Sequence, residues 1–340
     1  MNEFYNKLKY FEETEGIPKK VYYHYTSLDA LYEIIKTRTF RLMSLKSSND
    51  RQELFYKPEQ FIADIVKIGN QIENSEMKEF WELLSGSIQS HHSAFMKETK
   101  AKTQPYALCL SSKNDNLTHW DRYANGCKGV CIGFNVNALD VLYNRLSSRG
   151  FGVGCLDLGN ALYSQEEIDK KIKQQVYLAF RWLDDLRQTT GKDDICQVIR
   201  QSGYIAMVSI YFTIMKFAKK SAFLDEDEFR IYHDPRALKD TLSIIDGVKS
   251  DLRDVVYQNT RKNFLELVKR LNIREENFAI TKTGIRGYRN LCLDEIWGSG
   301  VIPEIVLGPL CVQNKRELQK FLKHNGLEGT KVTVSNVPLR

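Results

Sequence analysis

Short segments with the residue pattern of β-strands are separated in this chain by three long blocks of helical periodicity. The blocks span about residues 58–100, 164–220 and 237–272, where apolar residues recur at helical spacing. A parallel α/β fold would instead alternate single strands with single helices. The pattern therefore predicts an α+β fold, organised as a single domain over residues 1–340 with three helical insertions.

The segment from Val21 to Ser44 illustrates the β-type parts. Residues 21–25 and 39–44 are predicted strands, and between them Leu28, Leu31 and Ile35 recur at helical spacing behind a cap at Thr26 or Ser27. The same reasoning predicts further strands at 106–111, 129–134, 152–156, 223–232, 290–297, 304–308 and 331–335, and shorter helices at 116–123 and 315–323.

Composition places the chain among ordinary globular proteins, with 42% apolar and 27% charged residues in 340. A net charge of +6 is too small to mark the whole chain as a nucleic-acid binder. Its seven cysteines include no CxxC pair, so we expect no metal site. No apolar run suits a signal peptide or a membrane span, and we therefore expect a cytoplasmic protein without a membrane partner.

Familiar catalytic motifs are missing from the sequence. It contains no Walker loop, no GxGxxG after a strand, no HExxH and no GxSxG. The commonest classes of NTPase, dinucleotide-dependent dehydrogenase, metalloprotease and α/β-hydrolase are therefore excluded.

An acidic run lies inside the predicted strand 223–232. Alternation along a strand would put Glu226, Glu228 and Arg230 on one face. Two carboxylates beside a guanidinium are typical of a site where charge develops or a cation binds. The alternative is an exposed edge strand whose acids are solvated and oppose aggregation.

Two further groups of residues suit a nucleotide. His24, Tyr25 and Thr26 end the first strand where a helix begins, a position that favours an anion and a sugar hydroxyl. Trp120 and Tyr123 are spaced to share a helix face, where their rings could stack on a base or nicotinamide. Each group has a structural alternative, because buried histidines and aromatic helix faces are common in cores.

Two loops complete the set of candidates. Asn49, Asp50 and Glu53 form either a ligand contact or a turn that caps the following helix. Residues 251–290 hold nine Lys or Arg against five Asp or Glu. This segment ends in a stretch that could contact nucleic-acid phosphates or form a solvated rim, with Lys282, Arg286, Tyr288 and Arg289 as the candidate residues.

Taken together, these motifs resemble a bacterial family catalogued as domain of unknown function 2971. The resemblance rests on His24-Tyr25-Thr26, the Asn49-to-Glu53 loop, Ser111 to Asp115 with Trp120 and Tyr123, and Glu226 to Arg230. The tail segments 305–308 and 334–338 also look like the family's. The family often has Asn-Asp-Pro where this chain has Asn49-Asp50-Arg51.

The arrangement is also similar to the ADP-ribosyltransferase superfamily, which implies a mixed or antiparallel split β-sheet core and NAD as substrate. By this resemblance His24 anchors the adenosine ribose beside Thr26, and Ser111 or Tyr123 supports the nicotinamide ribose. Glu228 is then the catalytic acid, Glu226 deprotonates the acceptor, and Arg230 keeps both acids ionised or pairs with pyrophosphate.

The resemblance implies transfer of ADP-ribose to a macromolecule, or NAD hydrolysis, with a role in anti-phage defence or as a toxin-like effector. Two alternatives stay open. One is a metal-dependent nuclease or nucleic-acid binder that uses Glu226, Glu228 and Asp50. The other is a non-catalytic sensor or interaction module whose polar residues are structural.

Overall fold

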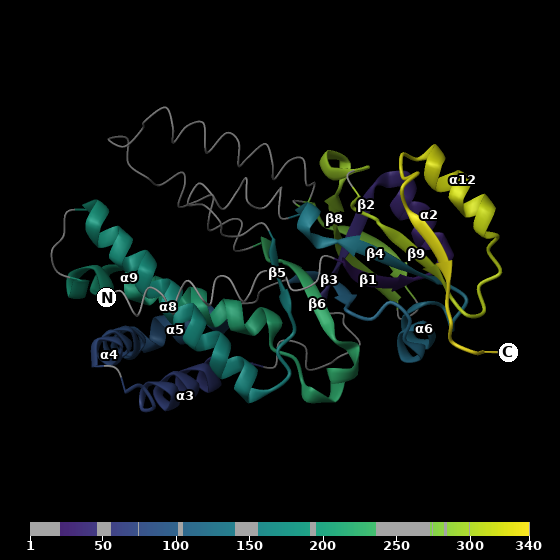
Figure 1. Ribbon diagram of the computed structural model, residues 1–340. Coiled ribbons are helices and arrows are strands. Elements are labelled where there is room, and N and C mark those ends of the chain that lie inside the picture. The colour runs from purple at the N-terminus through teal and green to yellow at the C-terminus, as the bar shows by residue number, and fades with distance from the viewer. Residues whose placement is uncertain are drawn as a thin grey trace. The chain divides into compact units, whose positions relative to one another are not determined.

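A computed structural model describes residues 21–45, 56–73, 75–100, 105–139, 156–190, 195–235, 273, 275–281, 284–298 and 300–339. The chain divides into two compact units (Figure 1). The described part of the first unit comes from residues 52–102 and 161–224. That of the second unit comes from residues 17–51, 103–160 and 225–340. The first unit contains the helical blocks predicted at 58–100 and 164–220, and the second contains the strands.

The second unit is built on an open, mixed sheet whose described strands follow the order β10-β9-β4-β1-β3-β2-β8-β7, with β6 and β5 branching from β3. Among these strands, β9 and β10 pair in parallel and the other ladders are antiparallel. The predicted α+β class is confirmed. The strands are β1 Val21–Thr26, β2 Thr39–Ser44, β3 Tyr106–Ser111, β4 Val130–Asn135, β5 Asp157–Asn160, β6 Glu228–His233, β7 Asn277–Thr281, β8 Gly284–Cys292, β9 Glu304–Leu307 and β10 Lys331–Val334.

Strand β3 is the branch point of this sheet. One of its edges pairs with β6 along its whole length, from Tyr106↔His233 to Ser111↔Glu228. Its other edge is shared by β1, at Ser111, and by β2, at Tyr106 and Ala107. The other edge of β6 pairs with β5, where Asn160 lies opposite Phe229. The last residue of β3 is therefore next to both β1 and the start of β6.

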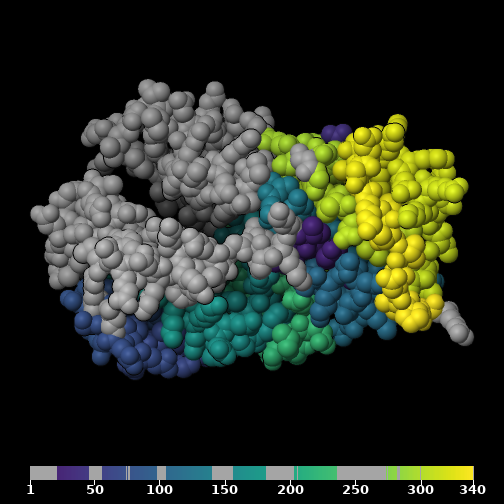
Figure 2. All heavy atoms as spheres, viewed as in Figure 1, coloured from purple at the N-terminus to yellow at the C-terminus, as the bar shows by residue number. Residues whose placement is uncertain are grey.

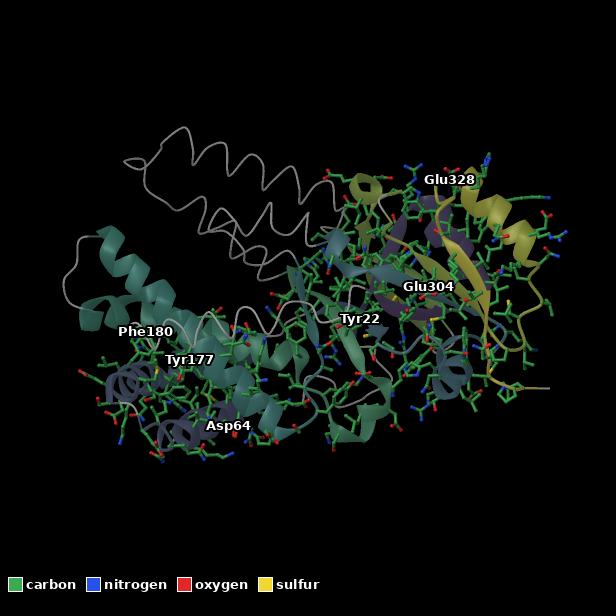
Figure 3. The ribbon with its side chains drawn as sticks, viewed as in Figure 1. Tyr22, Asp64, Tyr177, Phe180, Glu304 and Glu328 are labelled. Atoms are coloured by element: carbon green, nitrogen blue, oxygen red, sulfur yellow. The ribbon has the colours of Figure 1, made fainter. Side chains whose placement is uncertain are left out.

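The two faces of the sheet have different coverings. One face carries the main core, in which Tyr22 (labelled in Figure 3) stacks on Phe229 with ring centroids 4.0 Å apart. Residues of α2 (Leu28–Thr37) and α12 (Lys315–His324) pack into this core. The opposite face carries a smaller core that joins Tyr25 to Trp120 of α6 (Leu117–Tyr123). Side chains alternate between these two faces along each strand.

Side-chain caps fix where these helices begin. The Ser27 hydroxyl accepts the Ala30 amide at α2, which selects Ser27 from the two predicted caps. Asn116 and Asn314 cap α6 and α12 in the same way. Because a cap satisfies backbone amides that the helix cannot, each of these asparagines is a local signal that sets a boundary.

The structure corrects two of the strand predictions, and a third falls largely outside the described residues. Residues 223–226 are not strand, since a 3₁₀ helix, η2 (Ser221–Glu226), precedes β6 and Asp227 has a positive φ of 43° that breaks the alternation. The strand predicted at 290–297 ends at Cys292, and residues Asp294–Ile296 form the 3₁₀ helix η4. Residues 151–155 lie outside the described residues, and β5 begins beyond them at Asp157.

The first unit is helical and has its own core. Its helices are α3 Pro58–Gly69, α4 Ser75–Ser90, α5 His92–Lys100, α8 Gln165–Thr190 and α9 Ile195–Phe217. Phe80 of α4 lies edge-on to Phe180 of α8 (labelled in Figure 3), with centroids 4.8 Å apart. In the described part of the chain, no helix combines the length and the apolar character needed to cross a membrane. The helical block predicted at 237–272 lies outside the described residues.

Candidate functional site

The turn between η2 and β6 is fastened to the end of β3. The Ser111 hydroxyl donates to the Glu226 carbonyl at 2.8 Å, and the Ser112 amide donates to the Asp227 carbonyl at 3.1 Å. The Ser112 hydroxyl also donates to the Asp227 carboxylate. These bonds hold the turn at Asp227, which has a positive φ, in place. They also explain why the alternation of side chains along a strand does not predict the face on which Glu226 lies.

Helix α6 contributes two side chains to the same place. The Tyr123 phenol donates to Glu226 Oε1 at 2.6 Å, and His119 Nε2 lies 3.1 Å from the Glu226 carbonyl oxygen. We call Ser111, His119, Tyr123 and Glu226 the Glu226 site. Tyr123 is 40% exposed and Glu226 is half-buried, so the site faces solvent.

His119 is buried under this site, with a relative exposure of 4%. Its Nδ1 lies 2.8 Å from the Asn116 side-chain oxygen and its Nε2 faces the Glu226 carbonyl. Burial lowers the pKa of His119, although the contacts with Glu226 act in the opposite direction. A neutral imidazole carries one N–H, so at any moment it donates to one of these two oxygens.

Lys113 adds a positive charge beside the same turn. Its ammonium donates to the Asp225 carbonyl at 2.9 Å, and its backbone amide donates to the Ser111 hydroxyl at 3.2 Å. Its side chain is therefore tied to the segment that carries Glu226. An anionic group bound near this turn would meet a cation that the fold already holds.

Glu228 and Arg230 form a buried ion pair at the start of β6. Arg230 Nε donates to Glu228 Oε1 at 2.9 Å, and Arg230 Nη2 donates to Glu228 Oε2 at 3.3 Å. The Arg230 side chain is 0% exposed and the Glu228 side chain is 3% exposed. The predicted common face of Glu228 and Arg230 is confirmed, but Glu226 precedes the strand and does not share it. Removing one partner of such a pair is costly, because it leaves the other charge buried and uncompensated.

His24 points to the other face of the sheet. Tyr23, Ser111 and Glu228 are paired in register and so share one face, which puts the next residue along β1, His24, on the opposite face. There the His24 ring lies edge-on to Phe40 at 5.7 Å, and burial lowers its pKa to about 4. The structure therefore does not bring His24 together with Glu226 or Glu228. Thr26 has the same parity as His24.

Tyr25 and Trp120 are structural contacts on the α6 face. The Tyr25 hydroxyl donates to the Lys113 carbonyl at 2.8 Å and accepts the Asn116 amide at 3.1 Å. Trp120 is fully buried, and its indole N–H donates to Asp115 at 2.7 Å. No ring face of Trp120 is exposed to a ligand in this conformation.

Asp115 also holds the C-terminal segment. It accepts the Ser335 hydroxyl at 2.5 Å and the Asn336 amide at 2.7 Å. Figure 2 shows the corresponding surfaces, coloured blue for the α6 region and yellow for the C-terminal residues, next to each other. The carboxylate of Asp115 therefore links the loop before α6 to the end of the chain.

The remaining candidates are four residues that the structure does not describe and three in the β7–β8 hairpin. Asn49, Asp50, Glu53 and Lys282 lie outside the described residues. In the β7–β8 hairpin, Tyr288 lies under the Arg41 guanidinium, and Arg289 donates to the Ile273 carbonyl at 2.8 Å. Arg286 and Tyr288 share one parity of β8 and Arg289 has the other, so the strand does not gather them on one surface.

The sequence alone does not identify His119 as a site residue, and it does not show that Glu226 is the solvent-facing carboxylate. A histidine in a helical stretch is exposed by default, and the one local hint that His119 is buried is the Asn116 cap three residues earlier. Chemically, the site holds a solvent-facing carboxylate, a phenol and an imidazole, which together can stabilise positive charge and move a proton. Across the described ranges, no cluster of three His, Cys, Asp or Glu side chains is arranged to hold a metal ion.

Comparison with known protein families gives a match to part of the chain. Residues 119–231 are similar to a family described as "Protein of unknown function (DUF2971)". This segment includes His119, Tyr123, Glu226 and the Glu228–Arg230 pair, and it supports the resemblance to that family over about a third of the chain. No curated protein matches the chain, and no solved structure does.

Proposed function

We propose that this protein is a glycosyl-transfer enzyme that cleaves the nicotinamide–ribose bond of NAD and passes ADP-ribose to a macromolecule, with Glu226 as the reacting carboxylate. The observation that carries the proposal is the 2.6 Å hydrogen bond from Tyr123 to Glu226 Oε1 on the exposed side of α6. It orients an acid that substrate can reach. Glu228, the acid that the resemblance implies, is instead enclosed with Arg230.

The main requirement of the proposed reaction is a carboxylate that is held in a fixed position. As the C1′–N bond breaks, nicotinamide leaves with the bonding electrons and the ribose develops positive charge, which an ionised carboxylate stabilises. The acceptor then bonds to C1′ and loses a proton. In this proposal Glu226 stabilises the sugar cation and takes up that proton, while the Tyr123 phenol keeps the carboxylate in position.

Two neighbours support this assignment. The backbone carbonyl of Glu226 is held by the Ser111 hydroxyl at 2.8 Å, so the acid is fixed at its main chain as well as at its side chain. The Lys113 ammonium, held on the Asp225 carbonyl, would favour the pyrophosphate of NAD. Preorganisation of this kind contributes to catalysis because no group has to be reoriented in the transition state.

A second candidate is a binding module without catalysis. The buried Glu228–Arg230 pair favours it, because two of the residues expected at the reacting centre are enclosed in an ion pair with each other. In that case Glu226 and Tyr123 would contact a partner without reacting.

One assay separates the two candidates. The purified protein is incubated with NAD labelled in its adenylate part and with cell lysate, and free nicotinamide and labelled macromolecules are measured. We expect both products from the wild type and a loss of about 100-fold or more for Glu226→Gln, since removing a charge-stabilising group costs on this scale. The matched control is Asp121→Asn, an exposed acid on α6. No product from the wild-type protein, or equal product from Glu226→Gln, would contradict the enzymatic function.

A further inference from the structure

The β7–β8 hairpin carries an exposed apolar patch on one of its faces (β8 is labelled in Figure 1). Its register pairs Phe278 with Gly287 and Ile280 with Ile285, so these residues share one face. On that face Phe278 is 67% exposed, Ile285 is 74% exposed and Ile280 is 89% exposed. Residues opposite each other, and residues two apart on one strand, are neighbours on a face, so the three side chains are contiguous. A contiguous apolar patch is typical of an interaction surface, whereas scattered apolar residues are ordinary.

The hairpin continues beyond the ladder that joins it to the rest of the described sheet. The ladder between β2 and β8 ends at Met43↔Tyr288, while the ladder between β7 and β8 continues to Thr281↔Gly284. Residues 284–287 of β8 therefore have β7 as their neighbour among the described strands. A two-stranded ribbon is only marginally stable by itself. A further strand alongside β7 would stabilise this part of the sheet.

The base of the hairpin is fixed to the sheet. The Tyr106 phenol of β3 donates to Glu276 Oε1 at 2.5 Å. Glu276 directly precedes β7, and its carboxylate lies against Gly287 of β8, where a Cβ atom would clash with it. These contacts hold the start of β7 against both β3 and β8. The direction in which the ribbon extends, and with it the place of the apolar patch, is therefore set by the fold.

Strand β7 differs from the other edge strands of the described sheet because it has no charged residue. Strands β10, β5 and β7 each pair with one described strand and so form its edges. Charged side chains protect an edge from pairing with another chain, and β10 has Lys331 while β5 has Asp157. Strand β7 reads Asn-Phe-Ala-Ile-Thr, without a charge, a proline or a glycine. It therefore lacks the residues that would deter a further strand.

The same strand of a second copy of the chain suits this edge. In an antiparallel pair, residues directly opposite each other lie on the same face. A two-fold axis at Ala279 would place Phe278 opposite Ile280 of the second copy, and the two apolar patches would become continuous. The chain has a net charge of +6, and like charges brought together across an interface are unfavourable. An uncharged strand lets two copies meet without that repulsion.

We propose that two copies of this protein associate through β7, in an antiparallel pairing that continues the sheet of one copy into that of the other. Along such a ladder every second residue directs its N–H and C=O away from the inner neighbour, so the outer edge of β7 supplies the backbone groups for the pairing. Phe278, Ile280 and Ile285 supply the apolar contacts. The interface uses no residue of the Glu226 site, and its test requires no enzymatic activity.

The first test is the molar mass of the purified full chain, measured by sedimentation equilibrium. We expect the mass to rise from 39.5 kDa towards twice that value as the concentration increases from about 1 to 500 µM. In Ile280→Lys the dissociation constant should rise about tenfold or more, because both copies lose an apolar contact and gain a charge near the axis. Val312→Lys adds the same charge at an exposed valine outside the hairpin and should leave the dissociation constant unchanged. Circular dichroism confirms that both variants are folded.

Hydrogen exchange distinguishes pairing through β7 from association elsewhere on the surface. In the wild type, amide exchange of residues 277–281 should slow as the protein concentration rises, while exchange of residues 331–334 in β10 stays constant. A mass that stays at 39.5 kDa up to about 500 µM would overturn the proposal, and it is the result expected if a different protein occupies this face. Equal dissociation constants for Ile280→Lys and Val312→Lys would also overturn it, as would exchange at 277–281 that does not depend on concentration.

Discussion

The Tyr123 phenol lies 2.6 Å from Glu226 Oε1, although the two residues are 103 positions apart in the chain. Helix α6 supplies the phenol, and the turn before β6 supplies the acid. Because β6 pairs along β3 and α6 follows β3 closely in sequence, the sheet fixes the distance between them. The orientation of this carboxylate is therefore a property of the fold.

Removing the phenol hydroxyl should affect activity more than stability. In Tyr123→Phe we expect NAD cleavage to fall about tenfold to 100-fold, because one orienting hydrogen bond to Glu226 is lost. The free energy of unfolding should change by less than about 1 kcal/mol, since the ring is partly exposed. Rates of nicotinamide release and urea unfolding measure the two effects. Tyr32→Phe, at an exposed tyrosine of α2, serves as the control, and equal rates in both variants would contradict the role of Tyr123.

Breaking the buried ion pair should destabilise the protein strongly. Arg230→Met leaves the Glu228 charge enclosed, and we expect a loss of about 3–5 kcal/mol in the free energy of unfolding. Adding Glu228→Gln should restore much of this loss, because the remaining group is neutral. Arg38→Met, which breaks an exposed ion pair with Asp294, should cost less than about 1 kcal/mol. Urea unfolding of the wild type, Arg230→Met, the double variant and Arg38→Met measures these differences in the free energy of unfolding. A small effect of Arg230→Met would show that solvent reaches Glu228.

His24 should make stability depend on pH. Its pKa is about 4 in the folded protein and about 6.5 when unfolded, so between these values the unfolded chain binds more protons. The contribution of His24 to stability is present above pH 6.5 and is lost as the pH falls towards 4. Because at most one proton is taken up, the free energy of unfolding changes by at most about 1.4 kcal/mol per pH unit. In His24→Phe the free energy of unfolding should vary less over this interval. An unchanged slope would mean that His24 is hydrated in the folded state.

Asp115 should anchor the C-terminal segment. In Asp115→Ala the buried Trp120 indole N–H loses its acceptor and Ser335 loses its partner, for which we expect a cost of about 1–3 kcal/mol. Limited proteolysis should then cleave near residue 335 at a higher rate than in the wild type. Asp121→Asn, at an exposed acid of α6, should be cleaved at the wild-type rate. Equal cleavage of Asp115→Ala would contradict the anchoring role.

Local patterns predicted most of the strands that the structure contains. The strands at Thr39–Ser44 and Tyr106–Ser111 have the predicted bounds, because their composition and flanking turns are local properties. The common face of Glu228 and Arg230 is also confirmed, since it depends only on alternation within one strand. The resemblance to a family of unknown function is supported over residues 119–231.

The site could not be predicted in the same way, because long-range contacts decide it. Ser111 captures the Glu226 carbonyl and the chain turns at Asp227, so alternation fails one residue before β6 begins. The face of His24 depends on the register between β1 and β3, which is set by neither strand alone. For the same reason the sequence does not reveal that His119 is buried, since it packs against a turn more than 100 residues away.

Strand β5 ends at Asn160, and its ladder partner in β6 is Phe229. In topological terms β5 and β6 are therefore the two arms of a single hairpin, and the chain from 161 to 227 is its loop. The entropy of closing a loop grows only with the logarithm of its length, so a sheet bears a long insertion at little more cost than a short one. Lengthening or shortening this segment should thus cost the sheet little, while the register of the hairpin, and with it the Glu226 turn, stays the same.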